Sequence, residues 1–172
     1  MLNLVSQTRK AMQSELYYVA LISALSIPDI AGALEAKDRR ASKSHYVDWY
    51  EKWVRPRLAE TRSRDNPFSG EACYIFRCSM VHQGASHRSD SPYKKIIFIE
   101  PGYPNYSIHY CLVGGNALLI QIDQFIEEVL RGCELWLESV KDTEPFVTNY
   151  GHFAKRHPQG VAPYVIGVPV VG

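Results

Sequence analysis

The sequence has no excess of charge of one sign. Its 172 residues carry 19 Lys and Arg against 18 Asp and Glu, which leaves a formal net charge of +1. A protein that coats nucleic acid needs a large positive charge, and an acidic solvating tail needs a large negative one, so both classes are excluded. A local basic face within a neutral chain would still suffice to bind a nucleic acid.

Long apolar runs and a secretion signal are also missing. No run reaches the roughly 18 uncharged apolar residues of a membrane span, and the first six residues lack the basic and apolar regions of a signal peptide. The chain has four cysteines, which are Cys73, Cys78, Cys111 and Cys133. They lie in apolar runs and fit no zinc spacing. We expect reduced thiols, no metal, no membrane association and a cytoplasmic protein.

The chain is rich in hydrophobic residues (46%) and aromatics (12%), which favours one folded globular domain. Apolar residues recur at helical spacing in several segments. They predict helices over residues 3–26, 28–36, 44–60, 71–83 and 116–140. Breaks are expected at Ser26–Asp29 and near Pro56, and the fourth helix is expected to start at Ser69 or Gly70 and to end at Gly84.

Two further segments predict β structure and a tail. Residues 95–100 and 106–113 have the pattern of two strands around a loop at 101–105, which predicts a hairpin with a longer loop. From residue 145 the chain is punctuated by Pro and Gly. We therefore predict a mainly α fold: a helical bundle over residues 1–144 with a β-hairpin insertion at about 95–113. An extended tail over 145–172 would pack on this domain or on a partner subunit.

The near-zero net charge conceals two segments of opposite sign. Residues 37–65 carry a net +4, and residues 116–144 carry a net −5. In the basic segment, aromatic residues at helical spacing alternate with cations, a pattern that suits a nucleic-acid backbone. The candidate RNA-binding residues are Arg39, Arg40, Lys43, Lys52, Arg55 and Arg57. In the alternative interpretation the aromatics pack inward and the charges form a solvated face.

Residues 74–84 place an arginine and a histidine within a mostly apolar helix, in the pattern Arg77-x4-His82. Five residues advance about 500° around a helix, so the two side chains leave it about 140° apart. Arginine is long enough to reach round. Two such helices packed about a two-fold axis would bring both pairs into one cleft, so the pattern favours a homodimer.

These two residue types suit RNA cleavage. Arg77 offers a fork of donors to phosphate oxygens, and His82 exchanges protons near neutral pH, its charged form being favoured by the helix C-terminus. The nucleophile is the 2′-hydroxyl of the RNA, so neither a metal nor a cofactor is required. The alternative is structural: Arg77 forms a buried salt bridge with Glu71 or an acid of the last helix, and His82 caps its helix.

The Arg77-x4-His82 helix, lying between long helices, resembles that of the HEPN superfamily. The resemblance covers residues 3–140, and its specific part is confined to residues 74–84. It implies a helical bundle that dimerises through this helix, with Arg77 and His82 as catalytic residues. The candidate supporting residues are Cys78, which follows the arginine, and Glu71, which either orients Arg77 or is simply an N-terminal helix charge. Active members often carry Asn, Asp or His at the position of Cys78. Many members are metal-independent ribonucleases of toxin, phage-defence or RNA-processing systems, so an antitoxin or another protein partner is also implied.

Three functional hypotheses follow. The first is a metal-independent endoribonuclease with a composite site at a homodimer interface. The second is a non-catalytic HEPN-like module that binds a nucleotide, RNA or a protein. The third is a structural dimer in which the charge of Arg77 is paired internally.

Overall fold

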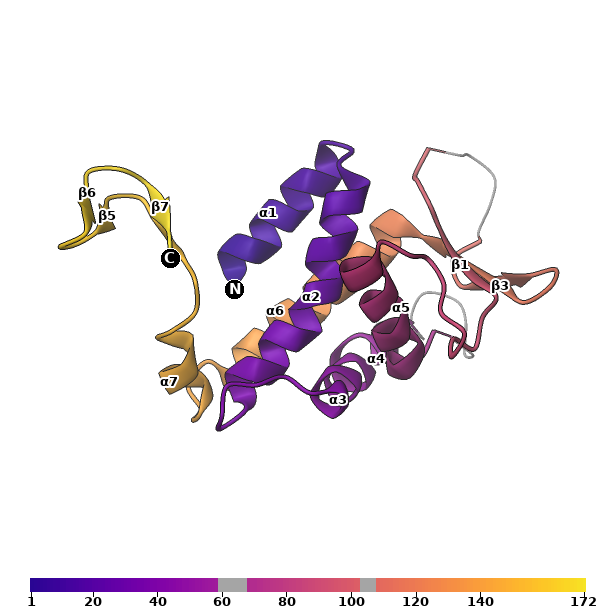
Figure 1. The fold of residues 1–172 in the computed structure, drawn as a ribbon, viewed down its shortest axis with the longest axis horizontal. Helices are drawn as coiled ribbons and strands as arrows, with labels where there is room; N and C mark the ends of the chain where they lie inside the picture. Colours follow the sequence, from indigo (N-terminus) through magenta and orange to yellow (C-terminus); the bar gives the residue numbers. More distant parts are fainter. Residues whose placement is uncertain (59–67, 103–107) are drawn as a thin grey trace.

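The computed structural model describes residues 1–58, 68–102 and 108–172 (Figure 1). Most of the regular structure is helical, which confirms the predicted mainly α class. The helices are α1 (Leu2–Gln13), α2 (Tyr17–Glu35), α3 (Lys43–Trp53), α4 (Arg55–Leu58), α5 (Gly70–Gln83), α6 (Ile122–Val140) and α7 (Phe146–Tyr150). The restart of the chain at α4 agrees with the break predicted near Pro56.

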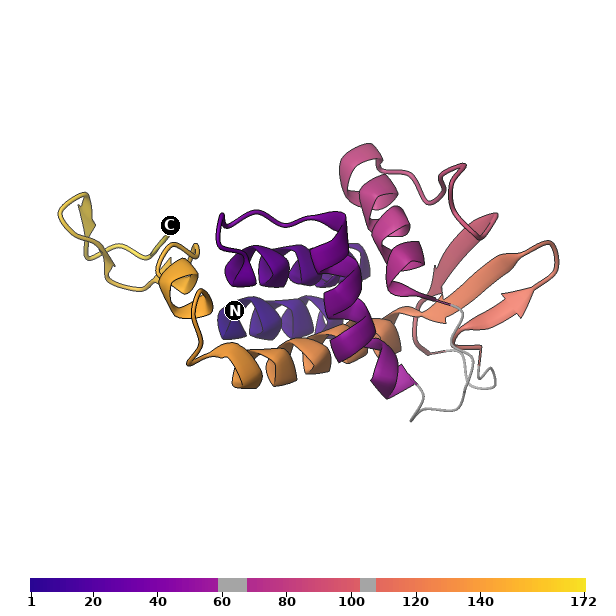
Figure 2. The same ribbon diagram turned by 90° about the horizontal axis from the view of Figure 1, so that it is seen from below.

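The helix α2 is the centre of the body, because it contacts α1, α3, α5, α6 and α7. Figures 1 and 2 show α1, α2 and α6 side by side, with α3 and α5 nearer the sheet. The core between them is aromatic, and its largest fully buried rings are Trp136, Tyr46, Tyr50, Phe68 and Phe125. A Cβ at Gly132 would lie 2.8 Å from the carbonyl oxygen of Trp53. Only glycine therefore allows α6 to cross the end of α3 so closely.

The prediction of one helix over residues 3–26 is wrong. The helix α1 ends at Gln13, and Glu15 takes a left-handed conformation with φ of 60°. The amide of Leu16 donates to the carbonyl of Ala11 at 2.9 Å, which closes a Schellman-type turn without its usual glycine. The break expected at residues 26–29 is absent, since Pro28 lies inside α2. Packing of α2 along its length offsets the loss of one backbone hydrogen bond.

By length and composition alone, α2 is apolar enough to cross a membrane. Half of its most apolar 18-residue window is buried within the fold. The buried half packs against the other helices of the body.

The predicted hairpin over residues 95–113 is also wrong. The strands β1 (Lys95–Ile99), β2 (Cys111–Val113) and β3 (Ala117–Gln121) form a sheet in the order β1-β3-β2. β1 is parallel to β3, and the antiparallel hairpin joins β2 to β3 through residues 114–116. The strand β3 occupies residues that were predicted to be the first part of a helix, so α6 begins only at Ile122. The proposed loop at 101–105 lies mostly outside the described residues.

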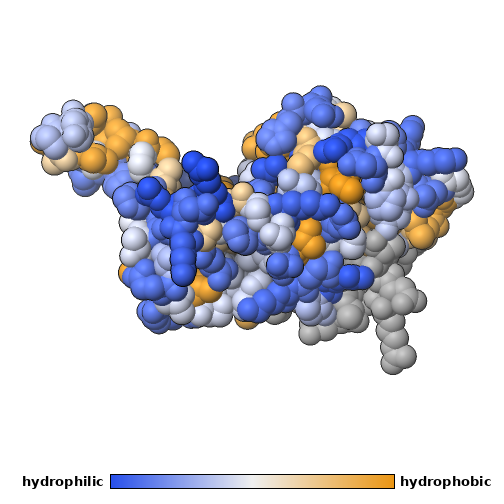
Figure 3. Space-filling view, turned by 60° about the horizontal axis from the view of Figure 1, so that its bottom comes forward, coloured by the Kyte–Doolittle hydropathy of each residue, from blue (hydrophilic) through white to orange (hydrophobic). Residues whose placement is uncertain are grey.

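The last 28 residues divide into a packed part and a projecting part. The helix α7 docks on the body, where the side-chain amide of Asn149 donates to the carbonyls of Leu34 and Ala36. Beyond it, β4 (Arg156–His157) pairs with β7 (Val170–Val171), and β5 (Gly160–Val161) pairs with β6 (Val165–Ile166). This arm projects from the body and carries hydrophobic residues on its surface (Figure 3).

Candidate functional site

The helix α5 has both of the ends that its sequence predicts. The hydroxyl of Ser69 accepts a hydrogen bond from the amide of Ala72 at 3.2 Å, as an N-cap does. At the other end Gly84 adopts φ of 61°, and the amides of Gly84 and Ala85 bond the last carbonyls of the helix. Local sequence therefore places His82 in the last turn and Arg77 near the middle.

Arg77 and His82 meet within a single chain. Nη1 of Arg77 lies 3.0 Å from Nε2 of His82, although the two residues leave the helix on different sides. The long arginine side chain spans the difference, as the sequence allowed. A dimer is thus not needed to bring this pair together.

The acid that pairs with Arg77 comes from another helix. Nη2 of Arg77 lies 2.6 Å from Oδ2 of Asp29 on α2, and the two side chains are 17% and 19% exposed. The sequence had suggested Glu71 or an acid of the last helix instead. Glu71 is exposed and pairs with Lys43 at 2.5 Å, so it supports neither Arg77 nor His82 by contact. Asp29, Arg77 and His82 are called the Arg77 cluster below.

Asp29 is the residue of the Arg77 cluster that sequence reasoning missed. It is the only charged residue between Tyr17 and Leu34, in an otherwise apolar helix. A lone acid on a buried helix requires a partner, because burying an unpaired charge is costly. That signal was available in the sequence, but the identity of the partner was not.

Burial and charge act in opposite directions on this ion pair. Burial raises the pKa of Asp29, and the nearby Arg77 guanidinium only partly offsets the increase. Burial also disfavours the charge of Arg77, but Asp29 and Cys78 outweigh it and raise the pKa of Arg77. The guanidinium therefore keeps its charge, and the carboxylate is the weaker partner.

The hydrogen-bond pattern defines the state of His82. A guanidinium only donates, so Nε2 of His82 must accept and the imidazole is neutral in this arrangement. The helix C-terminus alone had suggested the charged form. His82 is exposed.

Two further groups lie against the guanidinium. The sulfur of Cys78 is 3.8 Å from Nη1, and this side chain is half-buried. Nε of Arg77 is buried and, among the described residues, has no hydrogen-bond partner. Oδ2 of Asp29 is buried too and makes no hydrogen bond among the described residues, so its 2.6 Å contact with Nη2 is a close ion pair without hydrogen-bond geometry.

The basic segment is less free than its sequence suggests. Lys43 pairs with Glu71, Arg55 pairs with Glu51 at 2.7 Å, and Lys52 lies over the Trp53 ring. Arg39 and Arg40 are exposed and form no ion pair within the described part of the chain. The side chain of Arg57 is outside the described residues.

The aromatic residues of the same segment point mostly into the core. Tyr46, Trp49 and Tyr50 are buried. The inward packing of the alternative interpretation thus holds for these three rings, and they offer no stacking surface to RNA.

A second buried polar cluster links the sheet to α6. The hydroxyl of Tyr110 donates to Glu128 at 2.8 Å, and the amide of Gln121 donates to Nδ1 of His109. Nε2 of His109 then carries the proton and faces Glu128 at 3.3 Å. These bonds are internal, so this cluster joins elements of the fold and is not a candidate site.

Within 1–58, 68–102 and 108–172, no group of three or more His, Cys, Asp or Glu side chains is arranged to hold a metal ion.

Comparison of this chain with protein-family models, with curated proteins and with solved structures found no match. The assignment of a function therefore depends on the chemistry of the Arg77 cluster.

Proposed function

We propose that this chain is a metal-independent endoribonuclease of the HEPN type, with Arg77 and His82 as its catalytic pair. The observation that supports this most directly is the 3.0 Å contact between Nη1 of Arg77 and Nε2 of His82. A permanent cation and a proton acceptor are then within reach of one phosphodiester, at an exposed helix end.

In the proposed reaction, an RNA phosphate replaces His82 as an acceptor for Arg77. The freed Nε2 of His82 takes the proton of the 2′-hydroxyl, and the 2′-oxygen forms a bond to phosphorus. The bond from phosphorus to the 5′-oxygen breaks, and that oxygen takes a proton from a general acid. The products are a 2′,3′-cyclic phosphate and a 5′-hydroxyl. Arg77 stabilises the charge on the phosphorane, and DNA is not cut because it lacks the 2′-hydroxyl.

Asp29 acts as a positioning residue in this scheme. It holds the guanidinium through Nη2, which leaves Nη1 directed toward His82 and the solvent. A guanidinium held in this way loses less conformational freedom when it binds a phosphate.

In a homodimer that pairs through α5, His82 of the second copy would act as the general acid. Tyr74, Cys78 and Val81 are half-exposed on α5 and would lie at such an interface. Arg39 and Arg40, which are exposed, would guide RNA. We place this activity in the cytoplasm, in a toxin or phage-defence setting with an antitoxin or another protein partner.

Cleavage of RNA in EDTA tests the proposal. A fluorescent RNA oligonucleotide is incubated with the wild type, with His82→Ala and with Arg77→Lys, which keeps the charge but loses the fork. A matched control is His157→Ala, on the arm far from α5. We expect cleavage by the wild type and the control and strong loss in the two cluster variants. An oligonucleotide left intact by the wild type over a wide range of concentrations contradicts the proposal.

The ion pair to Asp29 favours a second candidate, the non-catalytic module. In this case Arg77 joins α2 to α5, and His82 with Arg77 binds a nucleotide or RNA without cutting it. Binding of labelled RNA that falls in Arg77→Lys, together with an uncut oligonucleotide, would support this second function.

A further inference from the structure

A pocket borders α5 and is not lined by the residues of the Arg77 cluster. It has a volume of about 270 Å³ and lies between the start of α2, the C-terminal half of α5 and β1. Phe76 and Met80 face this pocket, whereas Arg77 and His82 do not line it. It is therefore separate from the proposed catalytic pair.

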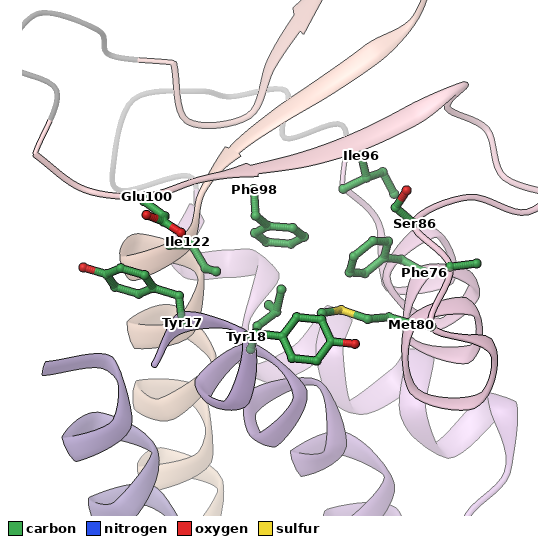
Figure 4. A pocket seen from close by; sticks show the side chains of 12 residues that line it. Tyr17, Tyr18, Phe76, Met80, Ser86, Ile96, Phe98, Glu100 and Ile122 are labelled. Carbon is green, nitrogen blue, oxygen red and sulfur yellow. The ribbon is translucent and has the colours of Figure 1, made fainter. Parts of the chain in front are cut away.

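Aromatic side chains form the interior of this pocket (Figure 4). Phe98 points into it from β1, Tyr18 lies opposite on α2, and Phe76 closes the side formed by α5. The rings of Phe76 and Phe98 are 5.3 Å apart, and Phe98 packs in turn on the buried Phe125 at 5.3 Å. The interior is thus held by the core, while Tyr18 at 59% exposure forms the entrance.

The charge around the pocket is negative. Glu100 lies at its edge beside Tyr17 and Ile122 (Figure 4). Burial raises the pKa of the Tyr17 hydroxyl, and nearby carboxylates raise it further; they belong to Glu15, Glu100 and Asp123. Oδ1 of Asp123 is buried and has no hydrogen-bond partner among the described residues.

Among the described residues that line the pocket, Glu100 is the one charged side chain. None of the described residues that line it is Lys, Arg or His. A phosphate-bearing ligand such as a nucleotide would meet repulsion here. The volume also falls slightly below the roughly 300–1,000 Å³ of pockets that hold drug-sized ligands, so the occupant must be small.

We propose that this pocket binds an organic cation, an alkylammonium or guanidinium group on a short apolar stem. Ring faces attract cations through their quadrupole, and the apolar stem buries against Phe76, Phe98 and Met80. The carboxylate of Glu100 accepts hydrogen bonds from the charged head. Such a group occurs on free polyamines and on the lysine and arginine side chains of proteins. This assignment does not depend on the ribonuclease proposal.

Calorimetric titration of the full chain with n-butylammonium, and with n-butanol as a neutral probe of the same length, tests the charge. Spermidine represents a free polyamine, and N-acetyl-lysine methylamide represents a protein side chain. We expect the ammonium to bind and the alcohol to bind at least about tenfold more weakly. Tighter binding of spermidine identifies a polyamine site, and tighter binding of the lysine derivative identifies a side-chain site.

Variants at the exposed rim test the location without disturbing the core. Tyr18→Leu removes the ring and should weaken n-butylammonium binding about fivefold, while Tyr18→Phe should retain it. Glu100→Gln should weaken it by a similar factor. Tyr164→Ala and Glu138→Gln, at exposed positions elsewhere, are the matched controls. Equal binding by all of these variants, or binding of guanosine in place of the cations, overturns the proposal.

Discussion

Two arginines each join a pair of helices, and the protein uses them differently. Arg9 connects α1 to α6 through Glu127 at 2.9 Å and Glu134 at 2.6 Å, a group called the Arg9 clasp below. Arg77 connects α5 to α2 through the single carboxylate of Asp29, and its other terminal nitrogen bonds a neutral imidazole.

The two arginines differ in the groups that their guanidinium donors face. Glu134 and then Glu127 raise the pKa of Arg9 further above its ordinary value, and Nε, Nη1 and Nη2 of Arg9 all donate to these two carboxylates. An anion at Arg9 would therefore have to displace a carboxylate that is already bonded there. In the Arg77 cluster, only Nη2 faces a carboxylate, and Nη1 contacts the ring nitrogen of the exposed His82. An arginine whose donors all face carboxylates has a structural role. An arginine that also contacts an exposed imidazole can still exchange that contact for a ligand.

The largest expected effect is on RNA cleavage. Loss of a general base costs about 10² to 10⁴-fold in rate, so we expect His82→Ala to lose that much activity. Arg9→Ala should keep the activity of the wild type per folded molecule. Initial rates on a fluorescent RNA in EDTA measure both. If Arg9→Ala loses as much activity as His82→Ala, the Arg9 clasp is as important for cleavage as the Arg77 cluster, and the comparison fails.

Unfolding in urea measures the next largest effect. Arg77→Ala leaves the carboxylate of Asp29 mostly buried and unpaired, and we expect a loss of about 3 kcal/mol. Arg9→Ala leaves two acids that are 29% and 39% exposed, and water solvates them, so about 1 kcal/mol is expected. Adding Asp29→Asn to Arg77→Ala should restore part of the loss. If Arg9→Ala is the more destabilising change, the clasp is the more important ion pair.

Thiol labelling compares the surroundings of the two arginines. Burial raises the pKa of Cys133, beside the Arg9 clasp, to about 12, whereas Cys78 beside Arg77 is half-buried. At pH 8 iodoacetamide should modify Cys78 about tenfold faster than Cys133. Peptide mass spectrometry reads out both sites, with the exposed Cys111 as the positive control. Rapid labelling of Cys133 would show that the α1–α6 contact opens.

The smallest expected effect is the contribution of Asp29 to the pH dependence of the free energy of unfolding. Burial raises its pKa above the ordinary 3.8, so the folded state favours the protonated acid. The resulting stability is present below about pH 3.8 and is lost as the pH rises through the raised pKa. Relative to Asp29→Asn, the wild type should lose stability over that range, as measured by urea unfolding at several pH values. A gain with rising pH would mean that Arg77 outweighs burial.

The sequence alone predicted features that depend on neighbouring residues. The ends of α5 follow from Ser69 and Gly84, and the course of α6 follows from its apolar stripe, because capping and helical periodicity act within one or two turns. Even so, the turn at Glu15 was missed. A left-handed glutamate carries none of the glycine signal that marks such a turn.

Tertiary structure decided the rest. The parallel pairing of β1 with β3 depends on backbone hydrogen bonds between distant segments, and a short apolar run such as residues 117–121 suits a helix or a strand equally. In the candidate site, too, the sequence predicted one part and tertiary packing decided the other. Sequence placed Arg77 and His82 on one helix, and only the packing of α2 against α5 selected Asp29, 48 residues earlier, as the counter-charge. Ion pairing depends on distance in space, which spacing along the chain does not specify.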